Sequence, residues 1–209
     1  MTTRLSAEGI TKSFGATQVL SGITLSVAPG EPVGLFGPNG SGKTTLVNIL
    51  SGLLPPDAGT VRFDGKEITR LPLDARYRLG IARTFQIPHP YPALSVREAV
   101  RVALAVNEGK RKEGGGTRED EEGPTEDLLA RTGLFNQRFV PCAQLSQGCL
   151  RRLEFARALA CRPKLLILDE VFSALSAADE GDLVALLRAA NRVEGTAFLL
   201  VSHNPPLLK

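Results

Sequence analysis

The chain has 209 residues, 43% of them hydrophobic and 22% charged, which fits one globular domain and excludes an intrinsically disordered protein. Its 25 basic and 22 acidic residues leave a net charge of +3, too small to indicate nucleic acid binding. No apolar run approaches the roughly 20 residues that cross a bilayer, and the first residues lack the apolar core of a signal peptide.

The three cysteines, Cys142, Cys149 and Cys161, are odd in number and show no CxxC spacing. This pattern indicates free thiols and disfavours a disulfide scaffold or a zinc site. It therefore predicts a reducing, cytosolic compartment.

Short apolar segments alternate with helical stretches, as in a layered α/β domain. Strands are predicted at residues 33–36, 59–65, 81–85, 165–168 and 197–201, and helices are predicted to begin near Lys43, Ser95, Thr125, Ser146 and Ala178. The segment 59–65 alternates with period two between glycines, which favours an antiparallel strand, whereas the last two strands are continuously apolar and should be buried on both faces. We expect a single domain over residues 1–209, with an α/β core at 1–86 and 153–209 and a mainly helical part at 87–152.

The most specific motif is a phosphate loop. It matches the pattern G-x-x-x-x-G-K-[ST] in full, as Gly37-Pro38-Asn39-Gly40-Ser41-Gly42-Lys43-Thr44. Glycines let backbone N–H groups turn toward phosphate oxygens, and the following helix adds its positive N-terminal end. Lys43 is expected to reach the β- and γ-phosphates, and the Thr44 hydroxyl to ligate Mg²⁺.

The alternative to a phosphate loop is a chance glycine-rich turn. The motif stands between an apolar strand and a helical stretch, which is the context that phosphate binding requires. We therefore predict ATP and Mg²⁺ as ligands, and we include Thr45 among the nucleotide-binding residues.

Polar residues also follow three further predicted strands at their carboxyl ends, where open α/β sheets bind ligands. These residues are Gln86, the pair Asp169 and Glu170, and His203. Asp169 is predicted to hold Mg²⁺ through water, and Glu170 to act as the general base toward the attacking water. Gln86 is predicted to orient water or contact the metal, and His203 to donate to the γ-phosphate. Taken alone, Gln86 or His203 is more simply an ordinary polar loop residue, but their combination with the phosphate loop indicates nucleotide hydrolysis.

In the order of its motifs the chain resembles the nucleotide-binding subunits of ABC transporters nearly end to end. Its further motifs are Lys12-Ser13-Phe14-Gly15, before the phosphate loop, and Leu145-Ser146-Gln147-Gly148-Cys149, before the pair Asp169 and Glu170. The resemblance implies that Phe14 stacks on adenine, although core packing is an equal explanation for that residue alone. It also implies that the segment with Ser146 and Gly148 is a signature loop, which caps the γ-phosphate held by the opposite subunit.

The resemblance further implies a P-loop NTPase (RecA-like) core with a mainly parallel sheet, an N-terminal antiparallel β part and an inserted helical subdomain. It implies a head-to-tail dimer with a second ATPase subunit, identical or different, and a peripheral place on membrane permease subunits at the inner face of the cell membrane. Within the family, residues 79–86 and 52–61 resemble the importers of branched-chain amino acids. The predicted function is ATP hydrolysis that powers solute uptake, with branched-chain amino acids as the candidate solute.

Two alternatives stay open. Cys149 stands where the signature usually has Gln, and Ser176 stands where an Asp usually crosses the dimer interface, which favours a weakly hydrolysing partner subunit. A non-transport ABC ATPase is the other alternative, although the chain has neither a long coiled-coil insertion nor a second cassette.

The segment 87–95 is the candidate permease contact because it directly follows Gln86. Its three prolines exclude a helix and stiffen the chain, while Tyr91 and Leu94 offer apolar anchors for a partner helix. The alternative is that both side chains pack under the helical lobe.

Overall fold

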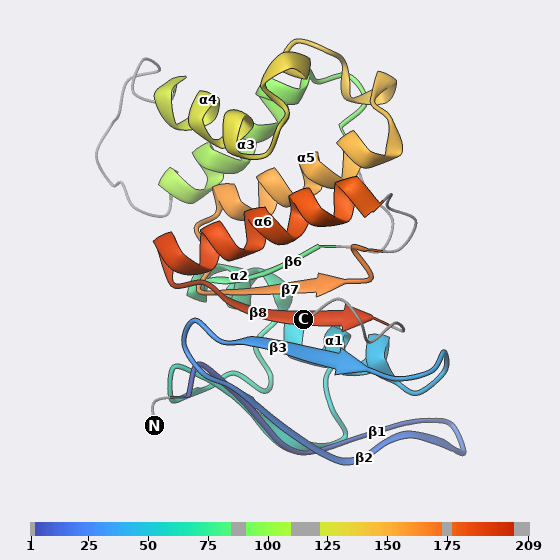
Figure 1. The fold of residues 1–209 in the computed structure, drawn as a ribbon. Helices are drawn as coiled ribbons and strands as arrows, with labels where there is room; N and C mark the ends of the chain where they lie inside the picture. Colours follow the sequence, from blue (N-terminus) through green and yellow to red (C-terminus); the bar gives the residue numbers. More distant parts are fainter. Residues whose placement is uncertain (1–2, 85–90, 110–121, 173–176, 203–209) are drawn as a thin grey trace.

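The computed structural model describes residues 3–84, 91–109, 122–172 and 177–202. Two sheets and the helices around them form three levels in Figure 1, with an antiparallel sheet at the bottom, a parallel sheet in the middle and a group of helices at the top. This arrangement agrees with the α/β class, the parallel sheet and the antiparallel part that the sequence predicts. The predicted site residues Gln86 and His203, and also Ser176, lie outside the described residues.

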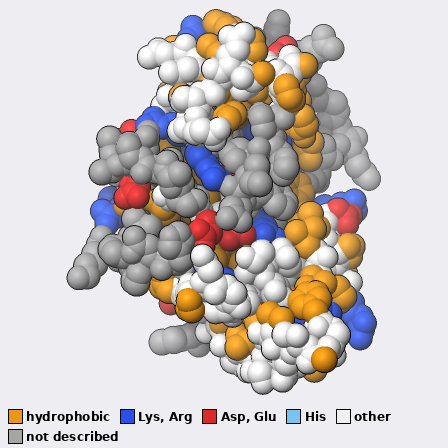
Figure 2. All heavy atoms as spheres, turned by 90° about the vertical axis from the view of Figure 1, so that its right-hand side faces the viewer, with side chains coloured by type: hydrophobic (Ala, Val, Ile, Leu, Met, Phe, Trp, Pro, Cys, Tyr) orange, Lys and Arg blue, Asp and Glu red, His pale blue; other side chains and the backbone are white. Residues whose placement is uncertain are grey.

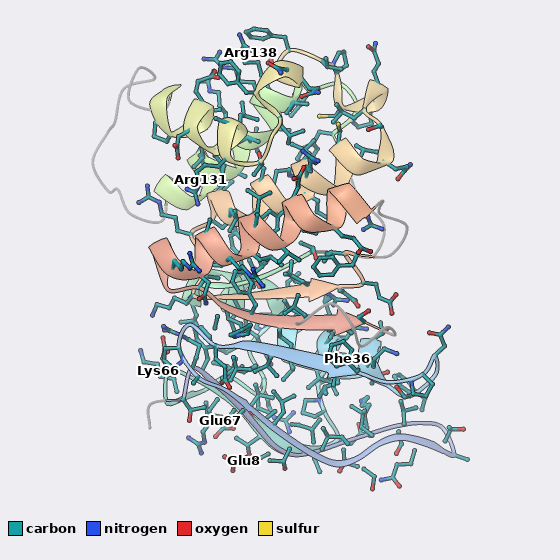
Figure 3. The ribbon with its side chains drawn as sticks, in the orientation of Figure 1. Glu8, Phe36, Lys66, Glu67, Arg131 and Arg138 are labelled. Carbon is teal, nitrogen blue, oxygen red and sulfur yellow. The ribbon has the colours of Figure 1, made fainter. Side chains whose placement is uncertain are left out.

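The antiparallel sheet has the strand order β2-β1-β4-β5. Its strands are β1 (Leu5–Phe14), β2 (Thr17–Val27), β4 (Ala58–Phe63) and β5 (Lys66–Glu67). β1 and β2 form a hairpin in which Leu5 pairs with Val27 and Phe14 with Thr17. The antiparallel prediction for residues 59–65 is confirmed by β4, which pairs with β1. Figure 3 labels Glu8, Lys66 and Glu67 along this sheet, at the lower edge of the molecule.

The parallel sheet has the order β3-β8-β7-β6. Its strands are β3 (Pro32–Phe36), β6 (Ile81–Arg83), β7 (Leu165–Asp169) and β8 (Ala197–Ser202). β7 and β8 are buried along their whole length, as their continuous apolar runs predict. Along β7 the side chains alternate: Leu165 and Ile167 belong to the core shared with α1 and the antiparallel sheet, while Leu166 and Leu168 belong to the core under the upper helices.

Six α-helices are described; one predicted start needs correction, and one helix was not predicted. The helices are α1 (Lys43–Ser51), α2 (Leu73–Leu79), α3 (Val96–Gly109), α4 (Glu122–Arg131), α5 (Gln147–Ala160) and α6 (Ala177–Glu194). α4 begins three residues before the predicted Thr125, which is fully buried within the helix. α2 is absent from the sequence prediction, although Asp74 in its first turn and Gly80 after its end are ordinary helix signals.

The start of α3 has the capping box that its sequence indicates. The backbone N–H of Ser95 donates to Glu98 Oε2 over 2.7 Å, and Glu98 N–H donates to Ser95 Oγ over 3.3 Å. The helices α3, α4 and α5 pack together in the upper part of Figure 1, and α6 packs against α5. α5 runs across the expected boundary between residues 152 and 153.

Candidate nucleotide-binding site

The glycine-rich loop between β3 and α1 has the backbone that a phosphate loop requires. Gly40 and Gly42 have φ values of 80° and 89°, in the left-handed region that favours glycine. Gly42 is the N-cap of α1, so the first N–H groups of this helix face the loop. The loop starts directly after Phe36, which Figure 3 labels at the end of β3.

Lys43 lies folded over this loop. Its Nζ donates to the carbonyls of Gly37, over 2.7 Å, and of Pro38, over 2.9 Å. The ammonium group is therefore held above the loop by the loop's own backbone. A polyphosphate in the loop would offer it stronger, charged acceptors.

Gly42 also connects the loop to the β1–β2 hairpin. A Cβ atom built on Gly42 would lie 2.8 Å from Leu20 Cδ2 and 3.1 Å from the carbonyl oxygen of Val19. The start of β2 therefore packs directly against the phosphate loop. Phe14 pairs with Thr17 at the turn of this hairpin, and in Figure 1 the turn lies on the same side of the molecule as the loop that follows β3.

Phe14 presents an apolar ring at the hairpin, with 51% of the residue exposed. Asp57 binds the two residues before Phe14: it accepts from Lys12 Nζ over 2.6 Å and from Ser13 N–H over 2.7 Å. These hydrogen bonds, that of Lys12 first, hold the pKa of the Asp57 carboxyl below its usual range. An exposed aromatic ring on a fixed turn is suited to stacking on a nucleobase.

Asp169 and Glu170 stand at the end of β7. The side chain of Asp169 is 5% exposed and forms an ion pair with Arg83, whose NH2 lies 2.8 Å from its Oδ2. Glu170 leaves the strand with a φ of 52°, an unfavourable backbone conformation for a residue with a side chain. Its N–H still donates to the carbonyl of Val201 over 3.0 Å, so β8 holds the strained turn in place.

The register of the sheet brings these groups to one edge. Phe36 pairs with Ser202 and Asp169 with Val201, so β3, β8 and β7 end side by side and at the same level. Figure 2 views this edge and shows acidic side chains near the centre of the face, with basic side chains close by. The phosphate loop and the pair Asp169 and Glu170 therefore share one edge of the sheet, as the sequence predicts.

The signature segment lies on a different element. Ser146 is the N-cap of α5, and its hydroxyl accepts from Cys149 N–H over 3.3 Å. Gly148 follows in the first turn of the same helix. α5 belongs to the upper group of helices in Figure 1, whereas the phosphate loop lies at the lower right.

Arg83 is the residue of this site that sequence reasoning missed. The signal was present, because a charged residue closes the otherwise apolar strand Ile81–Arg83 and must find partners there. It binds Asn48 and Ser51 of α1 as well as Asp169.

The oxygen donors at this edge fit Mg²⁺. Mg²⁺ is usually held by one or two carboxylates, a hydroxyl and the phosphates of the substrate, and Asp169 and Thr44 would offer the first two kinds of ligand. Within the described ranges no group of three or more His, Cys, Asp and Glu side chains is close enough to hold a metal ion. A metal held jointly with a nucleotide is therefore the kind of site that these residues suit.

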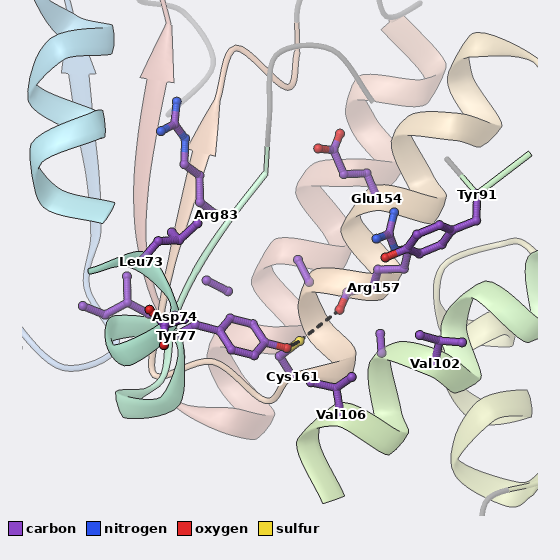
Figure 4. A pocket seen from close by; sticks show the side chains of 14 residues that line it. Leu73, Asp74, Tyr77, Arg83, Tyr91, Val102, Val106, Glu154, Arg157 and Cys161 are labelled. Atoms are coloured by element: carbon purple, nitrogen blue, oxygen red, sulfur yellow. Dashed lines mark hydrogen bonds between the residues drawn. The ribbon is translucent and has the colours of Figure 1, made fainter. Parts of the chain in front are cut away.

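A cleft of about 440 Å³ opens on another side of the parallel sheet, between α2 with β6 and the helices α3 and α5 (Figure 4). Three of its lining residues, Tyr91, Val102 and Val106, are large apolar residues that are 43 to 50% exposed. The guanidinium of Arg157 lies 4.6 Å from the ring of Tyr91. Leu94, in contrast, packs against the core under the upper helices, so only Tyr91 of the two predicted anchors faces the cleft.

The floor of the cleft carries a polar pair. The hydroxyl of Tyr77 on α2 and the thiol of Cys161 after α5 share a hydrogen bond, and Cys161 Sγ also donates to the carbonyl of Arg157 over 3.3 Å. Burial, and next the bond to Cys161, raise the pKa of Tyr77 well above its usual range.

Comparison with known proteins identifies the class to which this fold and site belong. A sequence model of the family described as ABC transporter matches residues 20–173, so the chain belongs to the ABC transporter family. Within that family it is an ATP-binding subunit with ATP hydrolysis as its activity. No helix among the described residues is long and apolar enough to cross a membrane.

Its relatives are ATP-binding proteins of several transport systems. An uncharacterized ABC transporter ATP-binding protein of Rhizobium meliloti is 37% identical, over 96% of this chain and 71% of the relative. The lipoprotein-releasing system ATP-binding protein LolD 1 of Caulobacter vibrioides is 37% identical, over 98% and 88%. The lipopolysaccharide export system ATP-binding protein LptB of Escherichia coli is 34% identical, over 96% and 80%. These comparisons support an ABC transporter subunit but not the resemblance to amino acid importers.

Two solved structures share the fold. The ADP conformation of an ATP-binding cassette of an ABC transporter superposes with a TM-score of 0.86 and 29% identity, over 100% of this chain and 84% of the other. A dimeric post-hydrolysis state of an ATP-binding cassette, bound to ADP and Pi, has a TM-score of 0.84 and 26% identity, over 97% and 89%.

Proposed function

We propose that this chain is the ATP-hydrolysing subunit of a transporter and drives solute movement through a separate membrane permease. The observation that carries the proposal is the common edge of β3, β8 and β7, where the phosphate loop and the pair Asp169 and Glu170 meet. Lys43 would leave the carbonyls of its own loop for the β- and γ-phosphates. The backbone N–H groups of the loop and the start of α1 would bind the remaining phosphate oxygens.

Glu170 is proposed as the general base. Its carboxylate would take a proton from the attacking water as that water forms a bond to the γ-phosphorus and the bond to the β-phosphate oxygen breaks. Thr44 and Asp169 would hold Mg²⁺, which neutralises charge on the phosphates. The proposed roles of Gln86, in orienting water, and of His203, in donating to the γ-phosphate, complete the site.

A second ATPase subunit is proposed to complete the nucleotide site. Ser146 and Gly148 stand at the N-terminus of α5, which is suited to an anion, but they belong to a different part of the fold from the phosphate loop. The dimeric post-hydrolysis state of a similar cassette supports a second subunit. In a head-to-tail pair, each signature segment would serve the other chain's nucleotide.

The cleft beside β6 is the proposed docking surface for the permease, which would place the chain peripherally at the membrane. Exposed apolar side chains there, Tyr91, Val102 and Val106, surround an opening wide enough for side chains of a partner helix. The same cleft adjoins β6, which runs toward the proposed nucleotide edge and ends three residues before Gln86.

The cargo is open to two hypotheses. Residues 79–86 and 52–61 favour uptake of branched-chain amino acids, while two relatives are the ATP-binding proteins of a lipoprotein-releasing system and of a lipopolysaccharide export system. ATPase stimulation in proteoliposomes with the cognate permease separates them: a free amino acid stimulates in the first case, and a lipid-anchored cargo in the second.

The test of the proposed ATPase site uses two variants. Lys43→Ala should lose tight ATP binding, because the charge that the loop holds in place is gone. Glu170→Gln should bind ATP normally while hydrolysis falls by about 10² to 10⁴, the usual contribution of a general base. Unchanged affinity in the first variant, or unchanged turnover in the second, would remove that residue from its role.

The alternative of a weakly hydrolysing partner subunit rests on Cys149 and Ser176. Restoring the usual residues with Cys149→Gln and Ser176→Asp should raise ATPase activity or ATP-dependent dimerisation if the departures weaken the shared site. Equal kinetics and equal size in the presence of ATP would make the departures neutral.

A further inference from the structure

Arg83 is held in a buried network between three elements of the fold. Its side chain is 6% exposed and that of its partner Asp169 is 5% exposed, with 2.8 Å between NH2 and Oδ2. The other terminal nitrogen, NH1, donates to Asn48 Oδ1 over 2.7 Å and to Ser51 Oγ over 3.3 Å. The guanidinium therefore joins β6 and β7 to α1, the helix that begins at the phosphate loop.

The position of the network along α1 sets the side from which Arg83 approaches. Thr44, Asn48 and Ser51 are spaced by four and three residues, so they share one face of the helix. Arg83 binds the second and third of these positions, one and two turns beyond Thr44. The guanidinium of Arg83 therefore approaches Asp169 from the turns of α1 that follow the turn with Thr44. It binds only one of the two carboxylate oxygens of Asp169. Figure 4 shows the guanidinium of Arg83 pointing away from Tyr77 and Cys161 on the floor of the cleft.

This geometry constrains the carboxylate. A terminal carboxylate rotates easily about its last torsion, which is broad and has no sharp preference. A planar guanidinium that Asn48 holds in place removes much of this freedom, and its charge compensates the burial of Asp169. The contact between Asp169 N–H and Thr84 Oγ1, at 3.4 Å, supports the backbone at the same residue.

We propose that Arg83 is a positioning residue for magnesium-dependent nucleotide binding, acting through the orientation of the Asp169 carboxylate. The inference rests on the proposed role of Asp169 as the residue that holds Mg²⁺. It differs from two other roles for a cation at this place. A guanidinium that competed with Mg²⁺ for Asp169 would weaken Mg²⁺-dependent nucleotide binding, so its removal would strengthen that binding. An ion pair that only stabilises the fold could be removed without changing how nucleotide binding depends on Mg²⁺.

The experiment measures equilibrium binding of a fluorescent ATP analogue with Mg²⁺ and with EDTA, in a Glu170→Gln background that prevents turnover. The measured quantity is the gain in affinity on adding Mg²⁺. Arg83→Ala should reduce this gain by about tenfold or more, the usual effect of removing a partner that orients a metal ligand, while affinity in EDTA stays within about twofold. Arg83→Lys keeps the charge but has no planar fork, so it should restore the gain in part.

Two further variants keep the outcome decisive. Asn48→Ala removes a hydrogen bond that holds the guanidinium, so it should reduce the gain in affinity by a smaller factor than Arg83→Ala does. If Arg83→Ala does not fold, Asn48→Ala and Arg83→Lys replace it in the test. Asp169→Asn tests the underlying role: a full gain in that variant would refute the proposed metal role of Asp169 itself. If Asp169→Asn loses the gain while the Arg83 variants keep or increase it, the positioning role of Arg83 is overturned.

Discussion

The guanidinium of Arg76 caps the carboxyl end of α1, with NH1 2.7 Å from the carbonyl oxygen of Ile49. The same side chain donates to the carbonyls of Leu50, Thr69 and Leu71, over 2.8 to 2.9 Å, and is 1% exposed. Burial lowers the pKa of Arg76 to about 10, so the group is still charged at neutral pH. It thus neutralises the negative end of the helix that begins at the phosphate loop.

Replacing Arg76 should therefore destabilise the protein strongly. We expect Arg76→Ala to lower the free energy of unfolding by about 3 kcal/mol or more, because several buried carbonyls lose a charged donor together. Denaturant unfolding measures this change. The control is Arg78→Ala, which is also on α2. The exposed ion pair between Arg78 and Asp74 should contribute less than about 1 kcal/mol. Similar losses in the two variants would contradict the capping role.

The phosphate loop offers a matched pair of glycines. Gly40 and Gly42 both have left-handed φ values, but a Cβ on Gly40 would meet nothing within 4 Å, whereas one on Gly42 would collide with Leu20 and Val19. Gly40→Ala should cost about 1 to 2 kcal/mol of conformational strain, and Gly42→Ala clearly more, since β2 or the loop must also move. Thermal unfolding of the nucleotide-free variants measures the difference. Equal costs would show that the hairpin does not confine the loop.

The cleft predicts a separation of transport from folding. Val106→Asp and Tyr91→Glu place a charge on the proposed docking surface and should abolish coupled transport, while ATPase activity of the isolated subunit and its melting temperature stay near those of the parent. Leu53→Asp is the control, because Leu53 is similarly exposed but does not line the cleft. Loss of stability together with ATPase activity in the cleft variants would make these side chains part of the core.

The raised pKa of Tyr77 predicts a delayed phenolate signal. Tyr91→Phe leaves Tyr77 as the only tyrosine in a chain without tryptophan, so absorbance at alkaline pH reports on it alone. The folded variant should show little phenolate near pH 10, the ordinary pKa of tyrosine, whereas the denatured chain should be half ionised there. Because folding raises the pKa of Tyr77, its neutral hydroxyl contributes fully to the free energy of unfolding below the ordinary pKa of tyrosine. That contribution is lost as pH rises through the pKa that Tyr77 has in the folded protein.

A further variant checks the cause of that shift. Burial is the larger cause and the hydrogen bond to Cys161 the second. Cys161→Ala in the Tyr91→Phe background should therefore lower the pKa of Tyr77 without returning it to the ordinary value. A folded protein that ionises like the denatured chain would contradict the buried position of Tyr77 at the floor of the cleft.

Local chemistry made much of this protein predictable from its sequence. The phosphate loop could be recognised because positive φ values require glycine and the following helix begins within the same few residues. The capping box of Ser95 and Glu98 and the buried strand β7 depend likewise on near neighbours and on hydropathy. The predicted start of α4 is wrong because the sequence at its actual first residues has no clear capping signal. Thr125 resembles a capping residue, although it is buried inside the helix.

The tertiary structure decided which side chains meet. Arg83 and Asp169 lie 86 positions apart, and only the pairing of β6 with β7 brings them to 2.8 Å. Leu94 is packed while Tyr91 is exposed, because α3 and its neighbours cover one and not the other. The clash that reserves position 42 for glycine likewise comes from Leu20 on another strand. Local hydrogen-bond and backbone preferences can be predicted from short stretches of sequence. Burial and charge pairing depend on contacts that exist only after the sheet has formed.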